Sequence, residues 1–352
     1  MKRNHHLHSV LVTGNSGYIG AVLTPRLAGE GYTVFGLDTG YYGSDCLLYD
    51  DDACVESQVQ KDIRDVKPDD FRNIDAVIHL AALSNDPLGE LETEMTEQIN
   101  YQGAMRVARC AREAGVRRFV YVSSQSMYGI SNTDEALDEE NSEKNPVTAY
   151  AKTKWQAECE LLEMDSDSFT VVAFRPSTVF GDSPKFRLDI VFNNLLGCAF
   201  STGTIEVKSD GSPWRPVIHI HDVCTALIAG LQADRGSVGR QAFNIGLPDG
   251  NYTVRQIAEA AQRLTPGSRL VFTGEHGPDS RTYRVSFNKI FTRLKRYYRP
   301  GWDLDTGGKK LVARFKNVGF DEKAFRSHRF TRLLHLKRLI EEGALSRQLR
   351  WR

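Results

Sequence analysis

The chain has 352 residues, enough to bury a large core in one body of two lobes. Its 45 basic and 45 acidic residues give a formal net charge of zero, which argues against nucleic acid or a membrane surface as a partner. No apolar run is long enough to cross a bilayer. The six cysteines are widely spaced and form no Cys-x-x-Cys pair, so neither a disulfide framework nor a zinc site is indicated. A protein of the reducing cytoplasm is therefore expected.

Short apolar runs alternate with helical patterns through the first half of the chain. Buried strands are predicted at residues 9–13, 33–37, 76–82, 118–123 and 170–174. Helices are predicted at residues 18–30, 91–114 and 149–164. This alternation is typical of right-handed βαβ units, which build a parallel sheet with helices on both faces.

The rhythm changes after Pro176. Helices are predicted near 188–199, 253–264 and 286–296, short strands at 205–208 and 269–273, and strands that rejoin the large sheet at 216–220 and 242–245. The predicted fold is α/β, a Rossmann-type doubly wound parallel sheet with a smaller interleaved α/β substrate lobe. The expected domains are a Rossmann domain at 1–176, completed by 216–250, and a substrate lobe at 177–215 and 251–345, followed by a frayed or surface-bound basic tail.

A glycine motif follows the first predicted strand and opens a helix. Gly14, Gly17 and Gly20 have the spacing G-x-x-G-x-x-G. Without a Cβ, such residues let the backbone turn tightly and approach a pyrophosphate, and the helix directs free N–H groups at the phosphates. Asp38 ends the second strand, where a carboxylate accepts hydrogen bonds from ribose hydroxyls and repels a 2′-phosphate. The pattern predicts a dinucleotide site that prefers NAD to NADP.

A second motif carries the chemistry. Tyr150 and Lys154 are four residues apart and therefore share one face of the predicted helix. A free phenol, with a pKa of about 10, is a weak base at neutral pH, but a neighbouring ammonium favours phenolate. Ser124 follows the preceding strand and can bridge the substrate oxygen and the phenol. These three residues predict hydride transfer coupled to proton removal from an alcohol.

No metal site is predicted. His5, His6 and His8 are interpreted as a solvated tail, and the acidic runs at 50–52 and 138–140 as solvated loops without a histidine nearby.

Taken together, these motifs resemble the extended short-chain dehydrogenase/reductases, the NAD-dependent nucleotide-sugar epimerases and dehydratases. Besides Tyr150 and Lys154, the stretches that carry the resemblance are residues 12–20 (VTGNSGYIG), 77–82 (VIHLAA), 122–129 (VSSQSMYG), 174–176 (FRP), 214–222 (WRPVIHIHD) and 279–281 (DSR). They span about residues 9 to 300.

The resemblance implies a role for each matching residue. Ser124, Tyr150 and Lys154 match the catalytic triad. The implied NAD contacts are Gly14, Gly17, Tyr18, Ile19, Gly20, Asp38, Asp62, Ile63, Leu80, Ala81, Ala82, Tyr150 and Lys154. The implied substrate contacts are Ser84, Ser124, Gln125, Ser126, Thr178, Arg215 and Arg281, of which the two arginines match positions that grip a nucleotide diphosphate. Asn100 matches an asparagine of architectural role.

The family reaction begins with oxidation of a sugar hydroxyl, usually at C4. Known 4,6-dehydratases place an Asp-Glu pair directly after the catalytic hydroxyl residue, whereas this chain has Gln125 and Ser126, which do not titrate usefully near neutral pH. The favoured prediction is therefore an NAD-dependent epimerase acting on a nucleotide-diphosphate sugar. An NADH-dependent 4-keto sugar reductase, a dehydratase and a non-catalytic NAD-binding sensor remain as alternatives. Thr178 stands where many UDP-sugar 4-epimerases have asparagine, so the sugar and the nucleotide stay open.

Many members of the family dimerise by pairing two long helices from each subunit. The helices predicted at 91–114 and 149–164 are the candidates here, and a homodimer is expected.

Overall fold

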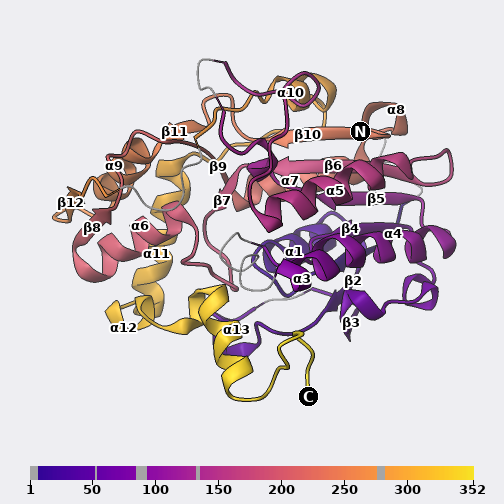
Figure 1. The fold of residues 1–352 in the computed structure, drawn as a ribbon, viewed down its shortest axis with the longest axis horizontal. Helices are drawn as coiled ribbons and strands as arrows, with labels where there is room; N and C mark the ends of the chain where they lie inside the picture. Colours follow the sequence, from indigo (N-terminus) through magenta and orange to yellow (C-terminus); the bar gives the residue numbers. More distant parts are fainter. Residues whose placement is uncertain (1–6, 52–53, 85–92, 132–134, 276–281) are drawn as a thin grey trace.

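The computed structural model describes residues 7–51, 54–84, 93–131, 135–275 and 282–352 (Figure 1). Its centre is a seven-stranded, wholly parallel sheet with the strand order β10-β6-β5-β4-β1-β2-β3. The strands are β1 (Ser9–Thr13), β2 (Thr33–Asp38), β3 (Ser57–Gln60), β4 (Ala76–His79), β5 (Arg118–Val122), β6 (Thr170–Pro176) and β10 (Gln241–Ile245). The predicted doubly wound Rossmann-type sheet is confirmed.

Helices cover both faces of the sheet because its strands are apolar on both faces. In β1, Val10 and Val12 join one hydrophobic cluster and Leu11 the other, as the two-residue period of a strand requires. The first face packs against α1 (Gly20–Gly29) and α7 (Ile220–Gln232). The second face packs against η4 (Glu97–Gly103), α4 (Ala104–Glu113) and α5 (Ala149–Glu163), and α3 (Thr93–Thr96) precedes η4.

A smaller lobe has its own core and two small sheets, visible beside the large sheet in Figure 1. One has the strand order β11-β9-β7, from β7 (Thr178–Phe180), β9 (Trp214–His219) and β11 (Asn251–Thr253). The other pairs β8 (Thr204–Val207) with β12 (Arg269–Phe272). The helices of this lobe are α6 (Val191–Thr202), α9 (Val254–Leu264), α11 (Leu304–Val318) and α12 (Glu322–Phe325).

Short elements complete the fold. They are η1 (Ser44–Cys46), η2 (Ile63–Asp65), η3 (Pro68–Phe71), η5 (Gln125–Tyr128), α8 (Arg235–Val238), α10 (Asn288–Arg293), η6 (His328–Phe330) and α13 (Arg332–Glu341). No helix in the described part of the chain is long and apolar enough to span a membrane. All six cysteines are free.

One predicted strand was placed in the wrong sheet. Residues 216–220 were expected to rejoin the large sheet, but β9 pairs with β7 and β11, and Ile220 begins helix α7. An apolar run shows that a segment is buried, not which sheet it joins. Only β10 returns to the large sheet, beside β6. The predicted strand at 76–82 is also too long, since β4 ends at His79 and the next three residues form the loop beyond it.

The end of the chain returns to the large sheet. Leu336 and Leu339 of α13, with Leu345 and Leu349 after it, are buried in the same cluster as Leu37 of β2. The tail from residue 347 is therefore anchored: Arg350 forms an ion pair with Asp65, and Trp351 packs on Tyr41 with ring centroids 5.9 Å apart. Figure 1 shows α13 and the C-terminus beneath β2 and β3.

Candidate functional site

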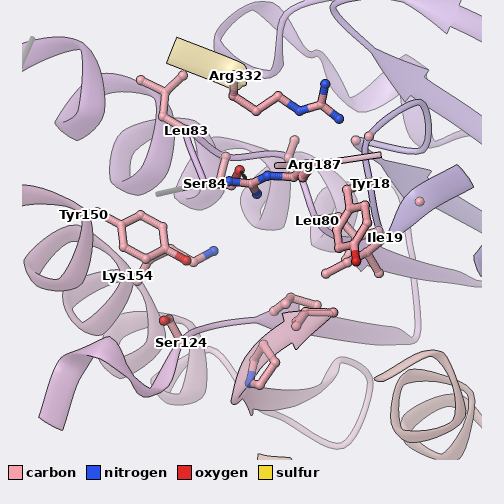
Figure 2. Close-up of a pocket in the computed structure, with 18 of the residues that line it drawn as sticks. Tyr18, Ile19, Leu80, Leu83, Ser84, Ser124, Tyr150, Lys154, Arg187 and Arg332 are labelled. Atoms are coloured by element: carbon pink, nitrogen blue, oxygen red, sulfur yellow. Dashed lines mark hydrogen bonds between the residues drawn. The ribbon is translucent and has the colours of Figure 1, made fainter. Parts of the chain in front are cut away.

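A cavity of about 500 Å³ lies at the carboxyl ends of the large sheet's strands, where ligands bind in open α/β folds (Figure 2). Every predicted site residue within the described ranges lines it, from the glycine loop to the candidate triad and Arg215. Arg281 lies outside the described residues. The structure therefore brings together, in one cavity, predicted site residues that are up to about 200 positions apart in the sequence.

The glycine loop forms one end of this cavity. Gly14 has a φ of +76°, and a Cβ there would lie 2.8 Å from the backbone nitrogen of Ala81. A Cβ on Gly20 would lie 2.4 Å from the carbonyl oxygen of Gly14, so the start of α1 packs directly on the loop. The loop thus has the tight turn and the close packing that a dinucleotide pyrophosphate needs, and the residues present fit that cofactor.

The neighbouring residue Tyr18 contributes little side-chain polarity to the cavity. Its hydroxyl donates to the carbonyl oxygen of Gly181 at 2.8 Å and accepts from Asn193 at 3.1 Å. Burial raises the pKa of Tyr18. This phenol is a buried structural group that ties α1 to the smaller lobe.

Two acidic residues lie at the predicted adenosine end. The carboxylate of Asp38 accepts from the backbone N–H groups of Ser16 at 3.2 Å and Gly40 at 2.8 Å. Burial raises its pKa, and these two hydrogen bonds oppose the change. Asp62 is engaged differently: its carboxylate receives a two-pronged bond from Arg64, with the shortest contact at 2.6 Å. Both line the cavity, but Asp62 is largely occupied by this ion pair.

The loop after β4 is held from behind. Asn100 accepts from the backbone N–H of Leu83 at 2.7 Å and donates to its carbonyl oxygen at 3.0 Å. This paired contact supports the architectural role predicted for Asn100. It fixes the loop that carries Leu80, Ala81, Ala82 and Ser84 to the cavity wall.

Ser124 begins the short helix η5. Its Oγ accepts from the backbone N–H of Ser126 at 3.1 Å and lies 2.9 Å from the Oγ of Ser126. Gln125 is 1% exposed, and its amide is fully engaged: Nε2 donates to the carbonyl oxygens of Arg175 and Ile245, and Oε1 accepts from Ser177. Gln125 therefore braces the ends of β6 and β10 and has little capacity left for a substrate, although it lines the cavity.

Tyr150 and Lys154 project from the first turns of α5 into the cavity (Figure 2). Thr148 caps this helix by accepting from the backbone N–H of Ala151 at 3.2 Å. Lys154 is 3% exposed, and its Nζ lies 4.5 Å from the ring centroid of Tyr121. Burial lowers the pKa of Lys154 to about 7, and the carboxylate of Glu158, one turn further along α5, opposes this shift.

The low pKa of Lys154 predicts a pH-dependent stability. The pKa of lysine in an unfolded chain is about 10.4, so between pH 7 and that value the unfolded chain binds more protons than the folded protein. The unfolding free energy therefore rises with pH through this window on account of Lys154. Compared with Lys154→Met, wild-type protein should lose about 1.4 kcal/mol of unfolding free energy for each pH unit as the pH is lowered from 10 to 7. Below pH 7 this difference should not change further.

Urea unfolding of nucleotide-stripped protein at several pH values measures this difference. Lys152→Met is the matched control, because Lys152 is exposed on the same helix. The prediction would be contradicted if the unfolding free energies of wild type and Lys154→Met changed in parallel between pH 7 and pH 10.

The remaining predicted substrate residues come from the smaller lobe. Thr178 opens β7, and Arg215 lies on β9 with its Nη1 donating to the carbonyl oxygen of Trp214 at 2.9 Å. Both line the cavity.

Two arginines are among the cavity residues that were missed from the sequence. Arg187 follows β7, and Arg332 opens α13, and both line the cavity (Figure 2). Neither belongs to a short motif, and Arg332 is more than 290 positions from the glycine loop, so no local pattern indicated either residue.

Known proteins are similar to this chain in sequence and fold. The model of the NAD dependent epimerase/dehydratase family matches residues 10–246. UDP-glucose 4-epimerase of Lactobacillus helveticus is 27% identical over 277 residues, covering 73% of this chain and 81% of the relative. dTDP-D-glucose 4,6-dehydratase of Bos taurus is 29% identical over 256 residues, covering 67% of each chain. The solved structure of MoeE5 in complex with UDP-glucose and NAD superposes with a TM-score of 0.75 at 25% identity, covering 88% of this chain and 99% of that one.

The family match covers the large sheet, its glycine loop and the candidate triad, and the predicted resemblance and the NAD cofactor are confirmed at the level of the family. The relatives differ in reaction, since both an epimerase and a dehydratase are among them. The chain belongs to the NAD-dependent epimerase/dehydratase family.

Proposed function

We propose that the protein is an NAD-dependent epimerase that acts on a nucleotide-diphosphate sugar through transient oxidation at C4. The observation that carries this proposal is the single cavity shared by the glycine loop, Ser124, Tyr150 and Lys154. The commitment of Gln125 to backbone groups favours epimerisation over 4,6-dehydration, because dehydration needs an additional acid and base beside the triad.

In the proposed mechanism, Tyr150 takes the proton of the sugar's C4 hydroxyl. NAD, when held by the glycine loop and Lys154, would supply the acceptor for the hydride that leaves C4. The ammonium form of Lys154 favours the phenolate that this step requires. The Ser124 hydroxyl, oriented by Ser126, donates to the sugar oxygen and fixes its position. After the keto sugar has turned over in the cavity, Tyr150 would return the proton to the C4 oxygen, and C4 would present its opposite face to the cofactor for return of the same hydride.

The test begins with the protein as purified. Denaturation should release nearly one equivalent of NAD or NADH, detected by absorbance and mass spectrometry, because an epimerase regenerates its cofactor in each cycle. Incubation with UDP-, GDP-, CDP- and dTDP-sugars should then convert one sugar to its C4 epimer without net change in NADH absorbance. Net oxidation of NADH by a 4-keto sugar would instead establish the reductase, and loss of water would establish a dehydratase. Tight NAD binding without turnover of any sugar would indicate a sensor.

Asp38 is proposed to select NAD over NADP. Its carboxylate is held at the end of β2, and the cations of Lys185 and Arg332 act on it electrostatically. Asp38→Ala removes the charge that repels a 2′-phosphate and leaves these cations to attract it. We therefore expect the ratio of NAD to NADP affinity to fall by about tenfold or more, measured by titration of stripped protein. Asp38→Asn should have a smaller effect on folding because it keeps an acceptor for the Gly40 N–H. An unchanged ratio in both variants would remove this role.

The predicted homodimer and cytoplasmic location remain proposals, as does the division into domains. The outer face of α4 exposes Arg106, Arg109 and Arg112, whereas α5 exposes Glu160 and Glu163. A two-fold axis that sets α4 of one copy beside α5 of the other would pair these opposite charges. Light scattering should give about twice the 39.5 kDa chain mass at moderate salt. A monomer at all concentrations would contradict the dimer.

A further inference from the structure

Arg332 is a buried cation with an incomplete set of partners. Its residue is 2% exposed, its Nη2 donates to the carbonyl oxygen of Lys185 at 2.7 Å, and its guanidinium lies over the ring of Tyr42 at 4.0 Å. The Nη1 atom is shielded from solvent and has no hydrogen-bond partner among the described residues. Because a buried, unsatisfied charged donor is costly, it is retained only where it has a use.

The surroundings of Arg332 leave its guanidinium without an ion pair. Across the described ranges of the chain, no carboxylate lies within ion-pair distance of its guanidinium. Asp189, which acts on Arg332 electrostatically, receives a two-pronged bond from Arg187 at 2.8 and 3.0 Å. Lys185, the next cation, donates to the carbonyl oxygens of Tyr42 and Gly43. Asp38 and Asp189 interact electrostatically with Arg332, but neither carboxylate forms an ion pair with it, so the Arg332 Nη1 is left without an acceptor among the described residues.

The position of the two arginines indicates the class of ligand. Arg187 donates to the Oγ of Ser84 at 2.9 Å, and in Figure 2 both guanidinium groups lie across the cavity from Ser124, with Tyr150 and Lys154 to one side and Tyr18 and Ile19 to the other. A ligand that extends from the glycine loop toward Lys154 therefore passes these guanidinium groups. Guanidinium groups suit bidentate contact with phosphate oxygens.

Helix α13 is fixed where it can present Arg332. His335, one turn further on, is 1% exposed, and its ring nitrogens contact the carbonyl oxygen of Tyr41 at 2.9 Å and the sulfur of Cys46 at 3.3 Å. Arg338 pairs with Asp45 at 2.6 Å. The start of α13 is thus held against the loop that follows Asp38, and its cation is directed to the cavity without any contribution from the sequence motifs.

We propose that Arg332, together with Arg187, forms a binding site for a diphosphate group, so that the C-terminal helix α13 is part of the ligand site. The inference rests on the proposed function, because both NAD and a nucleotide-diphosphate sugar supply this group. Either diphosphate would provide an acceptor for the Arg332 Nη1, which has no hydrogen-bond partner among the described residues.

The test compares Arg332→Met with Lys337→Met, which removes an exposed cation of the same helix outside the cavity. NAD is titrated calorimetrically into nucleotide-stripped protein, and thermal melting is followed with and without NAD. To test the nucleotide-diphosphate sugar as the source of the diphosphate, UDP, dTDP, GDP and CDP are titrated into NAD-loaded protein. We expect Arg332→Met to weaken binding of NAD or of the nucleoside diphosphate by about ten- to a hundredfold, and Lys337→Met to leave both affinities within about twofold.

The melting temperature separates ligand binding from a structural role. Stripped Arg332→Met should melt at or above the wild-type temperature, because a buried guanidinium with an unsatisfied N–H donor has been removed. The rise in melting temperature caused by its ligand should shrink. Weakening of NAD alone identifies the cofactor as the source of the diphosphate, and weakening of the nucleoside diphosphate alone identifies the substrate.

Three results would overturn the proposal. The first is that Arg332→Met binds both NAD and the nucleoside diphosphates as tightly as wild type. The second is that the stripped variant melts at a lower temperature but binds normally. The third is a loss of affinity confined to NADP, which would assign Arg332 to the 2′-phosphate. If no nucleoside diphosphate binds even the wild type, the sugar-nucleotide assignment fails, whereas the NAD arm still decides the role of Arg332.

Discussion

Tyr150→Phe is expected to lower turnover of the nucleotide sugar by about 10²–10⁴-fold while leaving NAD binding and the melting temperature close to wild type. The substitution removes one hydroxyl and keeps the ring that lines the cavity beside Lys154. Without that hydroxyl no group takes the proton as hydride leaves, so the loss should appear in kcat more than in KM. Steady-state rates on the sugar found by panel screening, with NAD titration alongside, measure both effects.

Tyr297→Phe is the matched control for this prediction. Tyr297 packs on the edge of the hydrophobic cluster that contains Val10 and Val12, and it does not line the cavity. The turnover rate of Tyr297→Phe should therefore stay near wild type. A wild-type rate for Tyr150→Phe would remove Tyr150 from the mechanism and leave the cavity without its proposed base.

Glu158→Ala is expected to cost about 3–5 kcal/mol of unfolding free energy, because it leaves a buried guanidinium without its counter-charge. Arg175 donates to Glu158 through Nε at 3.0 Å and Nη2 at 2.6 Å, and their side chains are 3% and 0% exposed. The Nη1 of Arg175 also donates to the Tyr128 hydroxyl at 3.0 Å. Urea unfolding at pH 7 measures the loss.

The double variant Glu158→Met with Arg175→Met provides the control for that result. Replacing a buried pair by apolar side chains of similar size is often nearly neutral, so the double variant should be more stable than Glu158→Ala. A small loss in Glu158→Ala, or a double variant less stable than the single one, would show that this pair is not the main support of α5 against β6. Glu158 also raises the pKa of Lys154, so its loss should make the catalytic ammonium scarcer near neutral pH.

Local patterns were sufficient to predict the cofactor half of the molecule. The apolar runs of β1, β2, β4 and β5 and the glycine spacing after β1 specify a parallel sheet with a phosphate-binding turn, because strand burial and glycine geometry depend on neighbours in the sequence. For the same reason Tyr150 and Lys154 could be placed together, since four positions on a helix bring two side chains to one face. The cofactor contact of Asp38 was predicted from its position at the end of the second strand.

Other features depended on contacts between distant segments. The sheet that β9 joins, the engagement of Gln125 by β6 and β10, and the arrival of Arg332 beside Arg187 all involve partners that sequence periodicity does not specify. Periodicity indicates which face of a helix or strand is buried. Which other element packs on that face depends on the packing of the whole chain. The sequence alone therefore determined the family, the sheet and the reactive pair, and only the tertiary structure decided which buried arginines share the cavity with them.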